Sequence, residues 1–191
     1  MMKETQIPSL YVEFRIEEQK LFLEYKVKNN LEKPIYLFNV LWDFNLKGDY
    51  IPAPSPVYSC LRSDGTLHLA KQILPLPKDR TVELRIIPFA QKVEAGHEFS
   101  EKISLPIPIA EYNPYYPLEP DSKTVEKFAD SIFFSLQFIE HSAQLEVANS
   151  SLPDSVRIDH PNIFGEVQTL ASKPKSVQIK VSKRAAAFGE F

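Results

Sequence analysis

The sequence predicts an all-β protein: an immunoglobulin-like or fibronectin-like antiparallel β-sandwich followed by a smaller β-rich region. Three observations support this fold class. Apolar residues recur with a period of two, turn signals separate the apolar runs by about ten residues, and the 16 prolines tend to fall between those runs. A period of two places alternate side chains on one face of a strand, whereas proline ends helices and removes a ladder donor. The pattern therefore favours many short strands over helices.

The first two strands form a predicted hairpin. Residues 10–17 and 21–28 alternate in side-chain character, with an apolar residue at every second position, and Gln19 and Lys20 supply a polar turn between them. Two amphipathic strands joined by a short turn are typical of a β-hairpin.

The third predicted strand, over residues 35–44, is nearly all apolar or aromatic and contains Trp42, the only tryptophan. A strand that is apolar on both faces lies at the centre of a sheet or under a second layer. Antibody-type domains pack such a tryptophan on a disulfide. The single cysteine, Cys60, excludes a disulfide within the chain, so the prediction is the general sandwich rather than the antibody type.

The remaining strands of the first region are short. A tight turn is predicted at Ser63-Asp64-Gly65-Thr66, because glycine tolerates a positive φ. The predicted strands around and after it cover residues 57–62, 67–74, 82–87, 88–93 and 99–105.

The predicted boundary of the sandwich lies in a proline-rich segment. Residues 106–120 read PIPIAEYNPYYPLEP, and five prolines in fifteen residues indicate an extended, partly stiff connector. We therefore predict a sandwich over residues 1–105, a connector over 106–120, and a smaller β-rich region over 121–191 that packs against the sandwich.

The second region has two possible patterns at its start. The apolar residues between 125 and 136 follow helical spacing, but those of 132–139 also alternate. Aromatic density favours a strand over 132–139, with room for one helical turn before it. Short extended runs follow at 144–148, 156–158, 167–171 and 177–181.

Composition excludes several classes of function. The five glycines lie far apart, and neither GxGxxG nor GxxxxGK[ST] occurs, which argues against the usual nucleotide-binding folds. We expect no cofactor. The net charge is −3 and the only basic cluster is in the last twenty residues, so nucleic acid is an unlikely partner. The lone thiol, and the lack of a basic-then-apolar leader or a long apolar run, predict a cytoplasmic protein without membrane insertion.

The histidines offer one alternative, enzymatic hypothesis. None of the four lies within four residues of another, so we expect no metal site. His160 follows Asp159 and His141 follows Glu140, and a carboxylate can orient an imidazole as in a hydrolytic triad. The nucleophile motif GxSxG is absent. Turn formation explains these polar residues equally simply.

The connector contains the candidate binding residues Tyr112, Tyr115 and Tyr116. Tyrosine gives a large contact area with little loss of entropy, and flanking prolines order a loop before it binds. In one interpretation these rings fill the gap between the two regions, and in the other they form a recognition surface.

The sequence thus predicts a non-enzymatic binding or interaction module for a protein or peptide partner, with no catalytic residue assigned. An unpaired edge strand could accept a peptide, or a second copy to form a homodimer. The alternatives are a hydrolase that uses a loop histidine with a nearby carboxylate, and a carbohydrate-binding module that uses the 112–116 tyrosines.

Overall fold

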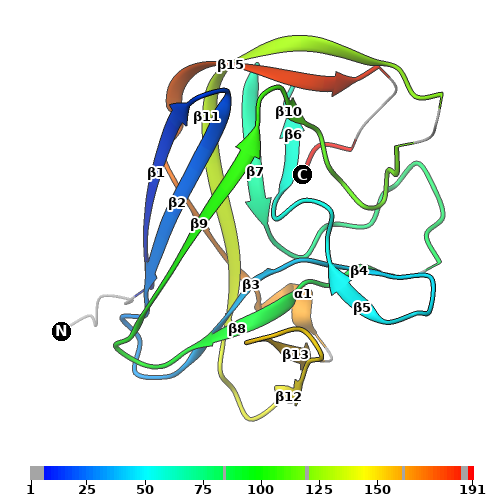
Figure 1. The fold of residues 1–191 in the computed structure, drawn as a ribbon. Coiled ribbons are helices and arrows are strands. Elements are labelled where there is room, and N and C mark those ends of the chain that lie inside the picture. Colours follow the sequence, from blue (N-terminus) through cyan, green and yellow to red (C-terminus); the bar gives the residue numbers. More distant parts are fainter. Residues whose placement is uncertain (1–6, 84, 119–120, 161, 186–188) are drawn as a thin grey trace.

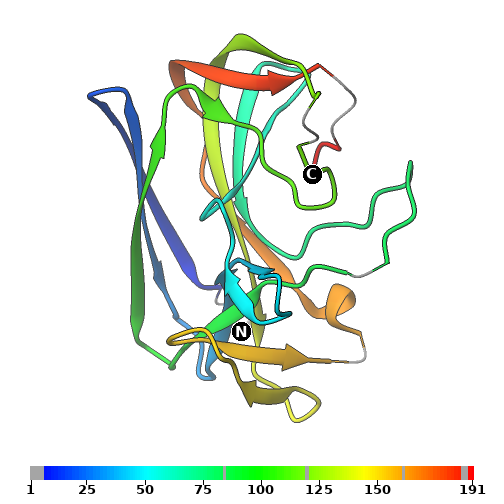
Figure 2. The same cartoon turned by 45° about the vertical axis from the view of Figure 1, so that its right-hand side comes forward.

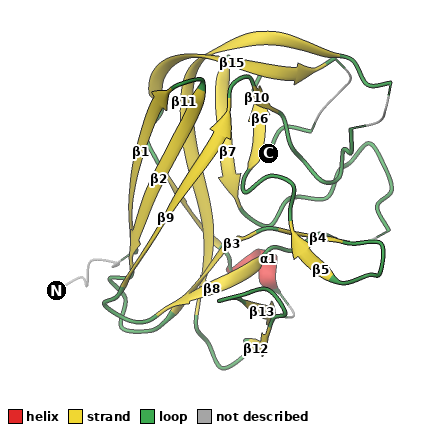
Figure 3. Cartoon of the chain, viewed as in Figure 1, coloured by secondary structure: helices red, strands yellow, loops and turns green. Residues whose placement is uncertain are grey.

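A computed structural model describes residues 7–83, 85–118, 121–160, 162–185 and 189–191, and these form fifteen strands and one short helix in three sheets (Figure 1). The all-β prediction is confirmed, since strands dominate the chain (Figure 3). The only helix among the described residues is α1 (Ile163–Glu166). Within the same residues, no helix is long and apolar enough to cross a membrane.

The first layer is a three-stranded antiparallel sheet in the order β1 (Ser9–Glu17), β2 (Lys20–Lys28) and β9 (Glu98–Pro106). The predicted hairpin is confirmed, although its turn lies one residue earlier than expected. Glu18 and Gln19 both have positive φ, at 46° and 61°. Two central residues of positive φ are the mark of the type I′ turn, whose twist matches that of paired strands.

The second layer is a ten-stranded sheet. Its main path runs through β10 (Ile109–Ala110), β15 (Lys175–Arg184), β11 (Thr124–Glu140), β3 (Ile35–Val40), β8 (Phe89–Val93), β13 (Val156–Asp159) and β12 (Glu146–Asn149). The strands off this path are β14 (Gln168–Ala171), β6 (Tyr58–Leu61) and β7 (Thr66–Lys71). A separate hairpin pairs β4 (Trp42–Phe44) with β5 (Tyr50–Pro52).

Two sequence predictions need correction. The run 35–44 is not one strand, because the chain breaks at Leu41 and β4 leaves the sheet to pair with β5. The described residues of the predicted strand 82–87, which are 82–83 and 85–87, do not form a strand, and Leu84 lies outside the described residues. Val82 and Ile86 instead pack as loop residues against buried aromatic rings. In both cases the contacts that decide the structure are tertiary and leave no local pattern.

The long strand β11 organises the large sheet (Figure 1). One of its edges pairs with β15 and β14, and the other pairs with β7 in parallel and with β3 in antiparallel fashion. The helical turn considered before residue 132 does not exist, because Thr124–Ala129 already pairs with β15. Strands from both sides of the 106–120 segment therefore share one sheet.

The main hydrophobic core lies between the two layers (Figure 2). The three-stranded sheet contributes Phe14, Leu21, Leu23, Tyr25, Val27, Ile103 and Leu105. The facing side of the large sheet contributes Ile35, Leu37, Leu67, Leu69, Ile132, Phe134, Leu136, Phe138, Ile179 and Val181, among others. Alternate residues of each strand supply these side chains, as the period of two requires.

A buried ion pair joins the two layers. The Lys71 side chain on β7 is 3% exposed, and its ammonium donates to both oxygens of Glu101 on β9 at 2.9 and 2.8 Å. It also donates to the main-chain oxygen of Asn39 at 2.7 Å, and the Tyr25 hydroxyl donates to Glu101. Burial lowers the pKa of Lys71 and Glu101 opposes that shift, whereas burial and then Glu101 raise the pKa of Tyr25.

A chain that ends at residue 105 tests whether the first region folds independently. We expect it to lack a cooperative unfolding transition, because β3 and β7 lose their ladder with β11 and expose their core face. Urea titration followed by near-ultraviolet circular dichroism measures this. A single sharp transition would show instead that residues 1–105 fold without the rest.

Glu101→Gln is expected to lower the free energy of unfolding by about 3 kcal/mol, because the buried Lys71 ammonium loses its counter-charge. Lys71→Met added to the same chain should restore most of this loss. Urea denaturation at pH 7 measures both. The control is Glu24→Gln on β2, whose carboxylate meets Lys102 at the surface at 3.2 Å and should cost less than about 1 kcal/mol. Equal losses from the two variants would contradict this account.

Candidate functional site

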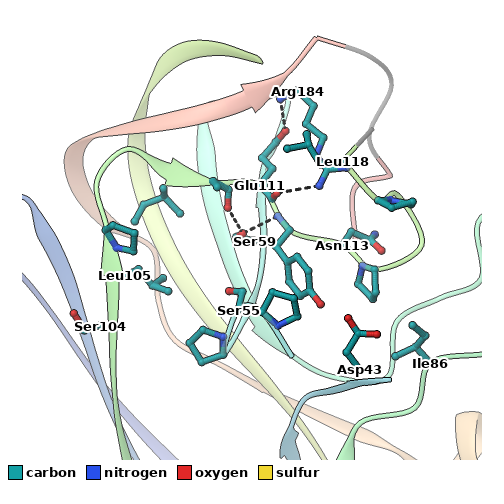
Figure 4. Close-up of a pocket in the computed structure, with 18 residues that line it drawn as sticks. Asp43, Ser55, Ser59, Ile86, Ser104, Leu105, Glu111, Asn113, Leu118 and Arg184 are labelled. Carbon is teal, nitrogen blue, oxygen red and sulfur yellow. Dashed lines mark hydrogen bonds between the residues drawn. The ribbon is translucent and has the colours of Figure 1, made fainter. Parts of the chain in front are cut away.

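A cavity of about 690 Å³ opens between the end of β9, the segment before β6, and the 109–118 loop (Figure 4). Its volume is within the range of small-ligand sites. Much of the wall is apolar: Pro54, Pro56, Leu105, Pro106, Ile109, Pro114, Pro117 and Leu118. Proline rings are stiff, so little entropy is lost when a ligand packs on this wall.

Ser59 fixes one wall of the cavity by bonds to the connector. Its main-chain nitrogen donates to the Tyr112 oxygen at 3.1 Å, and the Tyr112 nitrogen donates back to the Ser59 oxygen at 3.0 Å. The Ser59 hydroxyl also donates to the Ala110 oxygen at 2.7 Å (Figure 4). These bonds explain why a proline-rich segment lies in one conformation against β6.

Glu111, which lies between the two connector residues that Ser59 binds, also holds this segment in place. Its carboxylate is buried and accepts from the Leu61 nitrogen at 2.9 Å and from the Arg184 nitrogen at 2.8 Å. The Arg184 guanidinium donates to the main-chain oxygen of Glu111 at 3.3 Å and to that of Tyr116. Both charged groups are therefore used to tie the connector to β6 and β15.

The three predicted tyrosines occupy different environments. Tyr112 lines the cavity and its ring stacks on Tyr58 with 6.0 Å between centroids. Burial, with a smaller contribution from Asp43, raises the pKa of Tyr112 to about 12. The rings of Tyr115 and Tyr116 are buried, at 6% and 7% exposure.

Internal partners occupy the hydroxyls of the two buried tyrosines. The Tyr115 hydroxyl accepts from the Ile86 nitrogen at 2.8 Å, and the Tyr116 hydroxyl donates to Asp79 at 2.6 Å. The Arg80 guanidinium lies 4.0 Å from the Tyr116 ring centroid. Of the three candidate residues, only Tyr112 lines the cavity, and the rings of the other two belong to a buried cluster with Leu41, Tyr58 and Leu74.

Asp43 on β4 is a cavity residue that the sequence analysis did not identify. Its neighbours Trp42 and Phe44 contact one another on the other side of β4, with ring centroids 4.9 Å apart, whereas Asp43 lines the cavity. One carboxylate oxygen accepts from the Phe44 nitrogen at 2.7 Å. In the part of the chain that the structure describes, no lysine or arginine forms a salt bridge with Asp43. The sequence signal that could have identified Asp43 is a single acidic residue between two aromatic residues of an apolar run.

The loop histidines have no carboxylate partner among the described residues. The Nδ1 atom of His160 accepts from the Asn162 nitrogen at 3.0 Å, and the Asp159 carboxylate lies 3.7 Å from the Arg157 guanidinium. His141 contacts the Tyr36 hydroxyl through Nδ1 at 3.2 Å. Over the same described ranges, no three His, Cys, Asp or Glu residues gather as a metal site would require.

His68 forms a serine–histidine contact that the sequence does not indicate. Its Nε2 lies 2.7 Å from the Ser135 hydroxyl, and its Nδ1 lies 2.7 Å from the main-chain oxygen of Phe191. Since that oxygen can only accept, Nδ1 carries the proton and Nε2 accepts from Ser135. Burial lowers the pKa of His68 to about 4, so the ring is neutral at pH 7. Neither residue lines the cavity.

Cys60 lies beside His68 in the β6–β7 ladder and is buried, as its mid-strand position predicts. Burial raises the pKa of the Cys60 thiol to about 12, and the nearby Glu111 adds to the shift. The residue is therefore a protonated thiol at neutral pH, a form that is a poor nucleophile.

Comparison with known proteins gives no relative: no protein-family model, curated protein or solved structure matches this chain.

His68 predicts an acid-sensitive stability. The pKa of His68 is about 4 in the folded protein, whereas its ordinary value is 6.5. The contribution of His68 to the free energy of unfolding is therefore complete above pH 6.5 and is lost as the pH falls toward 4. Between pH 7 and 4 the wild-type protein should lose about 3 kcal/mol more unfolding free energy than His68→Gln. Urea titrations of both proteins across this range measure the difference. Parallel pH profiles would refute the contribution of His68.

Proposed function

We propose that this protein is a non-enzymatic binding module whose proline-lined cavity receives a side chain of an extended protein or peptide segment. The observation that carries this proposal is the position of the cavity beside an open strand edge. Ser104, Leu105 and Pro106 at the end of β9 line the cavity. Among the described residues β9 pairs only with β2, so its outer edge has no ladder partner. An extended peptide can add to such an edge while it places alternate side chains in a pocket.

The chemistry of the cavity supports binding. Its apolar wall offers burial to the hydrocarbon part of a ligand side chain, at about 25 cal/mol per Å² removed from water. The charged groups Glu111 and Arg184 hold the connector in place through backbone bonds. The wall is therefore formed before a ligand arrives, which lowers the cost of ordering it on binding.

Two finer assignments belong to the same proposal. We assign the sandwich to the immunoglobulin-like or fibronectin-like architectures, supported by two sheets that pack face to face around one core, although the larger sheet is mixed because β7 pairs with β11 in parallel. We place the protein in the cytoplasm, supported by its one buried, unpaired thiol at Cys60. The face of Tyr112 contributes to the ligand surface, whereas the buried rings of Tyr115 and Tyr116 support the loop from behind.

A displayed library of random peptides, selected on the wild-type protein, tests the proposal. Ala110 is exposed and lines the cavity, so Ala110→Trp should fill the cavity without disturbing the core. We expect enriched peptides to bind this variant at least about tenfold more weakly, a loss of about 1.4 kcal/mol, by calorimetry.

The matched control is Ala148→Trp, an equally exposed alanine on β12, which does not line the cavity and should leave the affinities unchanged. Circular dichroism establishes that both variants fold. Equal binding of the selected peptides to Ala110→Trp and wild type, or a failure to enrich any peptide, would overturn the proposed function.

A further inference from the structure

We infer that the segment bound in the cavity presents a lysine or arginine, whose aliphatic stem packs on the proline wall and whose cation pairs with Asp43. This inference rests on the proposed function and names the chemistry of the partner. It depends on three features of the cavity: the direction of Asp43, the absence of a cation beside it among the described residues, and the apolar surface that leads to it.

The aromatic residues of the β4–β5 hairpin hold Asp43 in place. Trp42 stacks on Phe89 with 5.5 Å between centroids, and Tyr50 meets the Trp42 ring edge-on at 4.9 Å. The Trp42 indole also donates to the main-chain oxygen of Ile87. Because successive side chains of a strand point to opposite faces, anchoring Trp42 on one face directs Asp43 to the other, into the cavity (Figure 4).

The two charged ends of the cavity differ in what they can offer a ligand. Glu111 and Arg184 lie at one end, where both charged groups bond to backbone atoms (Figure 4). Asp43 lies at the other end, and among the described residues its carboxylate accepts one hydrogen bond, from the Phe44 nitrogen. A carboxylate has about four lone-pair sites, so Asp43 retains capacity for a cationic donor.

Tyr112 lies beside Asp43 and extends the same recognition surface. The Tyr112 phenol is protonated at neutral pH, and burial and then Asp43 raise its pKa further. A protonated phenol accepts a hydrogen bond from an ammonium or guanidinium, and its ring attracts a cation through its face.

The apolar wall selects for a long basic side chain over other ligands. Lysine and arginine bury their methylene stems along apolar surface while the charged head reaches a polar partner. Pro54, Pro56 and Ile86 supply such a surface in the same cavity as Asp43. An acidic side chain would meet repulsion from Asp43, and a purely apolar one would remove water from the carboxylate without replacing it.

The test uses the peptides that the wild-type protein selects. We expect a lysine or arginine in them whose replacement by norleucine or citrulline, each of similar length but uncharged, weakens binding about tenfold. Asp43→Asn keeps the side-chain shape and should bind the basic peptide about tenfold more weakly than the wild-type protein does. Asp43→Asn and the wild-type protein should bind the neutral peptide with equal affinity, since the change in the protein and the change in the peptide remove the same interaction.

Two more variants complete the experiment. Asp49→Asn changes an exposed acid of the same hairpin, whose carboxylate accepts from Asn45, and should leave binding unchanged. Asp43→Lys should select acidic peptides from the same library, because the sign of the charge at the cavity is reversed.

The outcomes separate this inference from the proposed function. Selected peptides without an excess of basic residues, or equal affinity for the basic and neutral peptides, would overturn the inference and leave the binding module in place. A second outcome is that no peptide is enriched and that sedimentation shows the wild-type protein self-associating while Asp43→Asn does not. That result would assign the cavity to a second copy of the chain and would overturn both the inference and the proposed function. Peptides that bind Ala110→Trp unchanged would overturn both as well.

Discussion

Hydrogen bonds along both edges of β11 hold strands from distant parts of the chain in one sheet. Over Thr124–Ile132 the partner is β15, and further along the strand the partners are β14, β7 and β3. A central strand of this kind satisfies its backbone groups on both sides, which permits the burial of Ile132, Phe134 and Leu136 in the core. The three-stranded sheet then needs only to cover that face, and the Lys71–Glu101 pair fixes how the two layers meet.

The cavity depends on the same framework. β6 is paired to β7, and β7 to β11, so Ser59 and Leu61 are fixed points to which the connector attaches. The connector passes these points through Ala110, Glu111 and Tyr112, and Pro114 and Pro117 of the connector line the cavity. The site is thus formed where a loop with few ladder bonds of its own takes its conformation from a rigid sheet, which is a frequent arrangement for binding sites.

Local patterns in the sequence predicted those elements that bury one face. β1 and β2 follow the alternation of residues 10–17 and 21–28 because each strand has one face toward the core. The parallel pairing of β7 with β11 joins residues more than sixty positions apart, and no short-range pattern records such a register. For the same reason the contact of His68 with Ser135 could not be predicted. Of the three tyrosines predicted as binding residues, only Tyr112 lines the cavity, and Asp43 was not predicted because its position depends on how β4 leaves the large sheet.

The aromatic cluster around Trp42 has a practical consequence. Trp42 is the only tryptophan in the chain, and it adjoins Asp43 on a strand of three residues. Its indole contacts Phe44, Tyr50 and Phe89, so a small shift of β4 changes the surroundings of this one fluorophore. The emission spectrum of the unlabelled protein therefore acts as a native optical reporter of events at the mouth of the cavity, without any attached dye.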